Sequence, residues 1–98
     1  MTINKNANGT DLTIEVIGRL DTTTAPELEN EFKNSLDGVK NLRLDFGNLE
    51  YISSAGLRVV LAAQKKMNQQ GSMVVCNANE AIIEIFEITG FIDILTIE

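Results

Sequence analysis

Two adjacent hydroxyl groups, on Ser53 and Ser54, are the side chains of this sequence that are best placed to do chemistry. Only two small residues, Ala55 and Gly56, separate them from a long apolar pattern with helical spacing that begins at Leu57. Free backbone N–H groups and the positive end of the helix dipole favour negative charge at such a helix start. The spacing therefore predicts one of two roles: a serine that caps the helix, or a serine that takes a phosphate and switches a binding surface.

A second polar group follows an earlier expected strand. Asp21 ends the turn Gly18-Arg19-Leu20-Asp21, and the polar loop Thr22-Thr23-Thr24 comes next. Because both strands lead into helices, we expect Asp21 to lie in the same loop layer as Ser54. Asp21 is either an ordinary carboxylate at a strand end or a functional one. A functional carboxylate there would hydrogen-bond the serine, pair with a partner's basic group or repel an incoming phosphate.

A third candidate surface is a stripe of the helix that follows the serines. Its members recur about one turn apart, opposite the apolar residues that we expect to face the core. They are Arg58, Ala62, Lys65 and Gln69. The stripe is either a solvated helix face or a surface that faces a partner.

The composition disfavours enzymes and nucleic-acid binding. The chain has 98 residues, a formal net charge of −6 and no histidine. An acidic chain offers no basic stripe for nucleic acid or for an anionic membrane surface. Without histidine, the usual base for a serine nucleophile and the commonest transition-metal ligand are both missing. No glycine-rich nucleotide-binding motif occurs. We therefore expect a binding protein without a cofactor or metal, and an enzyme or nucleotide-binding protein is the least favoured class.

The expected location is the cytoplasm. The single cysteine, Cys76, stands in an apolar run and allows no internal disulfide, which fits a reducing compartment. The N-terminus shows no apolar signal-peptide segment. No apolar run approaches the roughly 18 residues that a membrane-spanning helix requires. We therefore expect no direct insertion into a membrane.

Hydrophobic periodicity predicts the strands that position these residues. Alternating or continuous apolar side chains indicate strands at residues 3–7, 10–17, 42–46 and 73–76, and a final apolar segment at 91–97 is expected to be at least partly strand. Asn8-Gly9 predicts a type I′ hairpin that makes the first two strands antiparallel neighbours. The nearly all-apolar strand 73–76 is expected near the centre of the sheet. Gly47–Glu50 is expected to be a loop.

Capping signals predict three helices. The first is expected to start at Thr24, in a capping box with Glu27, and to run to about Leu36. The second spans about residues 54–70, and the third lies between an Asn79 cap and Gly90, so that glycine follows its last turn.

The element order β-β-α-β-α-β-α-β predicts an α/β fold in one domain over residues 1–98. An initial hairpin followed by alternating helices and strands indicates a mixed sheet of four or five strands with right-handed crossovers. The helices are expected mainly on one side of the sheet, which leaves its other face partly open.

With these elements in place, the sequence resembles the anti-sigma factor antagonists, bacterial members of the STAS domain family. The resemblance covers nearly the whole chain and rests on Gly18-Arg19-Leu20-Asp21 with Thr24, Leu44-Asp45-Phe46, Tyr51-Ile52-Ser53-Ser54-Ala55-Gly56-Leu57 and, more weakly, Thr89-Gly90-Phe91. Ser54 falls on the family's phosphoacceptor serine, Ala55 on its small residue and Gly56-Leu57 on its glycine-leucine pair.

The sequence departs from the family pattern at two places. Ser53 occupies a position where many members carry aspartate, so Ser53 is a competing phosphoacceptor. The chain also stops at Glu98, where many members continue into a final helix.

The resemblance implies a partner switch. The unphosphorylated domain binds an anti-sigma factor that is also a serine kinase, and so frees a sigma factor. Phosphorylation of Ser54 breaks that complex, and a metal-dependent serine/threonine phosphatase restores it. The expected partner-binding residues are Asp21, Thr22, Thr23, Ser53, Ser54, Ala55, Gly56, Arg58 and Lys65. The alternative is a constitutive STAS subunit of a lipid-transport ABC complex or a larger signalling assembly, in which Ser54 is not phosphorylated.

Overall fold

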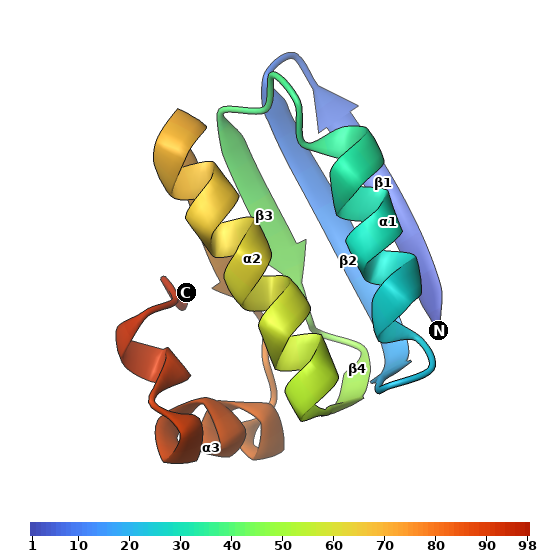
Figure 1. The fold of residues 1–98 in the computed structure, drawn as a ribbon, viewed down its shortest axis with the longest axis vertical. Coiled ribbons are helices and arrows are strands. Elements are labelled where there is room, and N and C mark those ends of the chain that lie inside the picture. The colour runs from blue at the N-terminus through green and yellow to red at the C-terminus, as the bar shows by residue number, and fades with distance from the viewer.

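A computed structural model describes residues 1–98 as a five-stranded sheet with helices packed on one of its faces (Figure 1). The elements, in chain order, are β1 (Thr2–Asn8), β2 (Asp11–Leu20), α1 (Ala25–Ser35), β3 (Asn41–Asp45), β4 (Leu49–Ile52), α2 (Ser54–Gln70), β5 (Ser72–Cys76), α3 (Glu80–Thr89) and the 3₁₀ helix η1 (Phe91–Asp93). The α/β fold class and the mixed sheet expected from the sequence are confirmed. None of these helices combines the length and apolar character that crossing a bilayer requires.

The long strand β2 organises the sheet. It pairs antiparallel with β1 and parallel with β3, which in turn pairs parallel with β5. A register shift at Gly18/Arg19 then lets the end of β2 pair parallel with β4. Gly18 has a φ of +100°, a backbone conformation that glycine tolerates best. One strand thus carries two different parallel neighbours along its length.

The core lies between one face of the sheet and the helices. The residues of β2 that point toward the helices are buried, while those between them are only partly buried. Both α1 and α2 cross this face side by side, and both begin at the end of the sheet where β4 lies (Figure 1). The largest fully buried side chains include Ile14, Leu20, Leu28, Leu36, Leu42, Leu44, Phe46, Leu49, Ile52, Met67, Met73 and Phe86. Burial of these apolar side chains is the main force that holds the helices on the sheet.

Two elements differ from the sequence predictions. Leu49 and Glu50, expected to belong to a loop, begin the strand β4 (Leu49–Ile52). The final segment, expected to be partly strand, forms the 3₁₀ helix Phe91–Asp93, and only Ile97 makes a bridge, to Val75. Strand β5 is therefore at the edge of the sheet rather than near its centre. The observed order is β-β-α-β-β-α-β-α, followed by the 3₁₀ helix.

The first hairpin also differs in its turn. Asn8 pairs with Asp11, so Gly9 and Thr10 are the central residues of the turn. Gly9 has a positive φ of +63°, and Thr10 does not have a positive φ. This combination fits a type II′ turn, because a type I′ turn requires a positive φ at both central residues. The antiparallel pairing of the first two strands is nevertheless confirmed.

The helix boundaries follow the capping signals with one exception. The bounds of α2 are as expected, and α3 has its Asn79 cap and a left-handed Gly90 after its last turn. Thr24 stands at the N-cap of α1, but its side chain makes no capping hydrogen bond. The predicted capping box between Thr24 and Glu27 is therefore wrong.

Candidate functional site

Strands β2 and β4 bring two loops to the same edge of the sheet. Their parallel register places Leu20 beside Ile52, at the last position of each strand. The backbone amide of Ser53 donates a hydrogen bond to the carbonyl oxygen of Leu20 at 2.8 Å. The loop that begins at Asp21 and the first turn of α2 are therefore neighbours, as the sequence predicted.

The two serines are not equivalent. Ser53 has an extended backbone, and its Oγ accepts a hydrogen bond from the Gly56 amide at 3.3 Å, so Ser53 is the N-cap of α2. Ser54 is the first residue of the helix and is exposed, and its hydroxyl makes no hydrogen bond. The amides of Ser54 and Ala55 also lack an acceptor within the chain, as expected for a first helical turn. The chain therefore presents a free hydroxyl beside two free N–H groups.

Gly56 lets α2 approach the end of β2 closely. A Cβ atom at this position would lie 2.7 Å from Cγ of Leu20, 3.0 Å from the Leu20 carbonyl oxygen and 3.0 Å from Cγ1 of Ile52. These contacts are too short for any side chain larger than hydrogen. The glycine thus fixes the position of Ser54 through packing, and it does not line an open cradle.

Asp21 orders its own loop. Its Oδ1 accepts hydrogen bonds from the Thr23 hydroxyl at 2.7 Å, the Thr23 amide at 3.0 Å and the Thr24 amide at 3.1 Å. The hydrogen bond from the Thr23 hydroxyl, followed by those from the two amides, holds the pKa of Asp21 below its usual value. No hydrogen bond joins Asp21 to Ser54, so the structure does not support the direct link that the sequence allowed.

The hydroxyl of Thr24 closes the same loop. It donates to the carbonyl oxygen of Arg19 at 2.8 Å and accepts from the Asp21 amide at 2.8 Å. These bonds occupy the group that the sequence assigned to helix capping. Asp21, Thr23 and Thr24 therefore form a preordered turn in front of α1.

Arg19 and Tyr51 belong to the sequence motifs described above but were not among the expected site residues. The Arg19 guanidinium lies over the Tyr51 ring, 4.5 Å from its centroid, and Nε of Arg19 is 3.9 Å from Oδ2 of Asp21. Tyr51 is 38% exposed. Only the parallel register of β2 and β4 reveals this pair, because it places Arg19 opposite Tyr51.

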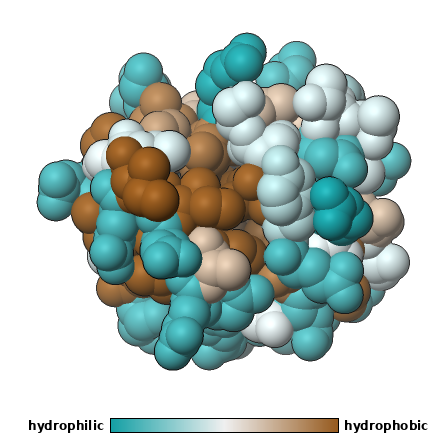
Figure 2. All heavy atoms as spheres, turned by 90° about the horizontal axis from the view of Figure 1, so that it is seen from below, coloured by the Kyte–Doolittle hydropathy of each residue, from teal (hydrophilic) through white to brown (hydrophobic).

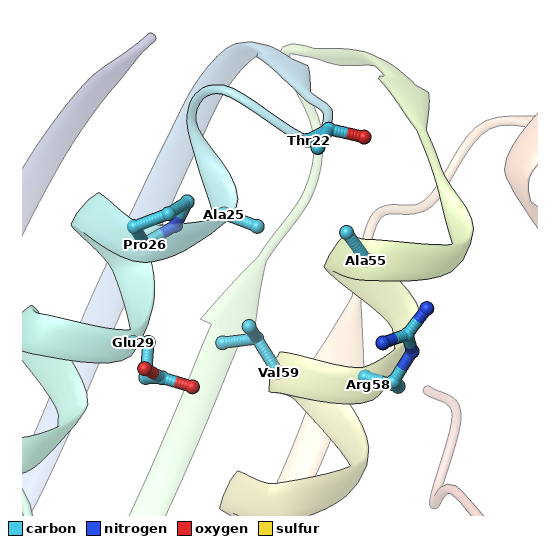
Figure 3. Close-up of a pocket in the computed structure, with 7 residues that line it drawn as sticks. All are labelled: Thr22, Ala25, Pro26, Glu29, Ala55, Arg58 and Val59. Atoms are coloured by element: carbon cyan, nitrogen blue, oxygen red, sulfur yellow. The ribbon is translucent and has the colours of Figure 1, made fainter.

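A groove of about 240 Å³ separates the first turns of α1 and α2 (Figure 3). It is lined by Thr22, Ala25, Pro26, Glu29, Ala55, Arg58 and Val59. A second hollow of about 280 Å³ shares Glu29 and Val59 with it and continues between the two helices toward Lys66. The groove thus joins Thr22, Ala55 and Arg58 from the sequence prediction into one surface.

Lys65 lies apart from this surface. It follows Arg58 by seven residues on the same exposed side of α2, which places it about 10 Å farther along the helix.

Figure 2 views the end of the molecule where α1 and α2 begin, and it shows pale residues of intermediate hydropathy next to a hydrophobic area over α3. The structure contains no cluster of three or more His, Cys, Asp or Glu side chains that could hold a metal ion.

The chain belongs to the STAS domain family, because the model of the STAS domain matches residues 2–98. Its curated relatives include BtrV of Bordetella bronchiseptica, which is named as an anti-sigma factor antagonist. BtrV is 43% identical over 82 residues, which cover 82% of this chain and 71% of BtrV. The anti-sigma-B factor antagonist of Bacillus subtilis is 31% identical over 91 residues, covering 92% of this chain and 84% of that protein.

The solved structures of Bacillus SpoIIAA, an anti-sigma factor antagonist, show the same fold. The unphosphorylated form matches with a TM-score of 0.77 at 14% identity, over 99% of this chain and 87% of that chain. The phosphorylated form matches with a TM-score of 0.77 at 15% identity, over 99% of this chain and 91% of that chain.

Proposed function

We propose that this chain is an anti-sigma factor antagonist controlled by phosphorylation of Ser54. The unphosphorylated chain binds an anti-sigma factor that is also a serine kinase, and this binding releases a sigma factor. Phosphate on Ser54 turns the binding off, and a serine/threonine phosphatase restores it. The observation that carries the proposal is the exposed, unbonded hydroxyl of Ser54 at the first residue of α2, in a chain of this family.

The surroundings of Ser54 suit a binding surface that a kinase can also reach. The neighbouring residues are small, the Ser54 hydroxyl is free, and the loop containing Asp21 is ordered by its own hydrogen bonds. The expected contact surface comprises Asp21, Thr22, Thr23, Ser53, Ser54, Ala55 and Arg58, with Lys65 at its margin, and Gly56 supports it. Gly56 is buried and contributes by positioning the turn rather than by touching the partner.

The phosphate changes the surface rather than the fold. It adds a charge of about −1.5 to −2 at neutral pH. If that charge costs about 1.4 kcal/mol of binding free energy at the interface, the partner binds tenfold more weakly. Near the start of α2, that charge meets free amides and the positive end of the helix dipole, so the helix itself is not disrupted. In this role the chain is a substrate and a binding partner and needs no catalytic group.

The proposal implies a cytoplasmic protein, and the single buried thiol of Cys76 suits that reducing compartment. SpoIIAA, which shares the fold, has been solved in a phosphorylated form. That state of a structural neighbour motivates the search for the same modification here.

Incubation of the chain with its cognate anti-sigma factor kinase tests the proposal directly. With ATP, we expect one phosphate per chain, mapped to Ser54 by mass spectrometry. Ser54→Ala should abolish the modification, while the matched control Ser53→Ala should keep it. Phosphate on Ser53 in the unsubstituted chain would transfer the role to the neighbouring serine.

Binding titrations with the same kinase test the switch. We expect Ser54→Ala to bind like the unsubstituted chain, and Ser54→Asp or the phosphorylated chain to bind at least tenfold more weakly. Equal affinities for all of these forms would overturn the switch. If affinity purification of the chain instead recovers an ATPase transporter subunit, and Ser54 is unmodified, the chain is a constitutive STAS subunit.

A further inference from the structure

Arg58 is the arginine of this chain that has no carboxylate partner. The other two arginines form ion pairs, Arg19 with Asp21 at 3.9 Å and Arg43 with Glu98 at 3.0 Å. Arg58 is exposed on the wall of the groove between α1 and α2. It takes part in no ion pair or side-chain hydrogen bond. Its guanidinium is therefore free to receive an anion.

Ser54 and Arg58 stand four residues apart in α2, so they are neighbours on one face of the helix. Side chains at this spacing have Cβ atoms roughly 5–6 Å apart, and helical side chains lean toward the N-terminus of their helix. Figure 3 shows the Arg58 guanidinium directed toward the first turn of α2. A phosphate on Ser54 and this planar, five-donor group would thus be within reach of each other.

The other cations near this end of the molecule are less suitable. The Arg19 guanidinium is stacked on Tyr51 and lies next to Asp21. Lys65 is eleven residues after Ser54, about 16 Å along the helix axis. Arg58 is therefore the cation that the helix geometry brings to a phosphate on Ser54.

We propose that Arg58 binds the phosphate of phosphorylated Ser54 within the same chain, an inference that rests on the proposed modification of Ser54. The phosphate then changes the surface in two ways at once. It introduces negative charge, and it withdraws the Arg58 guanidinium from the set of groups that the unphosphorylated surface offers to a partner. A serine-to-aspartate variant would imitate this state incompletely, because one carboxylate has fewer acceptor oxygens and less charge than a phosphate.

Installing phosphoserine at position 54 during translation tests this inference without any kinase. The second pKa of the phosphate is then measured by 31P NMR over pH 4–9 in the full chain, since a cation that binds the dianion lowers this pKa. We expect Arg58→Gln to raise the phosphate pKa by roughly half a pH unit and Arg58→Lys to raise it less. Lys65→Gln, which removes the same charge from the same helix face, should leave it nearly unchanged.

The two proposals fail in distinguishable ways. An unchanged phosphate pKa in Arg58→Gln, or an equal rise in Lys65→Gln, would overturn the role of Arg58 whatever the kinase does. Absence of kinase modification at Ser54 would overturn the proposed function but would not alter the NMR result. Circular dichroism of the phosphorylated Arg58→Gln chain confirms that the compared proteins are folded. A pKa difference between folded chains that shrinks but persists at high salt supports a direct ion pair, because salt screens distant charges more strongly than charges in contact.

Discussion

Oγ of Ser53 lies 3.3 Å from the Gly56 amide nitrogen, and this hydrogen bond makes Ser53 the N-cap of α2. The sequence alone allowed either serine to be a structural cap or a phosphoacceptor. The structure assigns the cap to Ser53 and leaves the hydroxyl of Ser54 unbonded and exposed. A requirement for capping therefore explains Ser53 but gives no reason for a serine at position 54.

The first prediction separates the two serines by their effect on stability. Ser53→Ala should lower the free energy of unfolding by about 1 kcal/mol, because the Gly56 amide loses its acceptor. Ser54→Ala should change it by less than about 0.5 kcal/mol, since the Ser54 side chain is exposed and unbonded. Urea unfolding followed by circular dichroism measures both. Equal losses would show that Ser54 shares the capping role.

The second prediction concerns the close contact at Gly56. Alanine is a better helix former than glycine by about 1 kcal/mol, but the new Cβ would clash with Leu20 and Ile52. We expect Gly56→Ala to lower the free energy of unfolding by about 1–3 kcal/mol in the same urea experiment, as overpacking does. Ala62→Gly, on the exposed side of α2, serves as the control for propensity alone. A more stable Gly56→Ala chain would contradict the tight packing.

Local signals were sufficient to predict most of the fold. Helix α2 was predictable because small residues precede a long apolar stripe and Gly71 follows it, and α3 because Asn79 and Gly90 mark its two ends. Strand β4 was not predictable from periodicity. Its four residues are buried only at the two ends, Leu49 and Ile52, and its pairing depends on a register shift in β2.

Candidate residues for the site could be named from the sequence, but their geometry could not. Thr24 has the residue type of a helix cap, yet its hydroxyl instead bonds the Arg19 carbonyl and the Asp21 amide within the loop. The pair of Arg19 and Tyr51 depends on strand register, and the groove beside Arg58 depends on how α1 and α2 pack. Such relations arise between distant segments and leave no periodic trace in the sequence.

The third prediction contrasts two residues of α3. Phe86 is fully buried, whereas Ile88 is 82% exposed. Figure 2 shows a hydrophobic area over α3, the helix that carries both residues. Phe86→Ala should cost about 3–5 kcal/mol of stability. Ile88→Ala should change stability by less than about 0.5 kcal/mol, because little apolar area is lost from the core. Thermal unfolding of the two variants checks the contrast, and a large loss in Ile88→Ala would place that side chain in a packed contact.

The fourth prediction follows the protonation of Asp21. Its pKa is lowered in the folded chain, first by the Thr23 hydroxyl, so the folded state favours the carboxylate. The resulting stability is fully present above the unfolded pKa of about 3.9 and is lost as pH falls through the lower folded pKa. We expect Thr23→Val to move the folded pKa of Asp21 up toward its usual value, measured by NMR titration of the side-chain carboxyl carbon. Thr22→Val, next in the chain and without a hydrogen bond to this carboxylate, should leave the pKa of Asp21 in place. An equal shift in both variants would mean that general solvation of the loop, rather than the Thr23 hydroxyl, holds this carboxylate in its charged form.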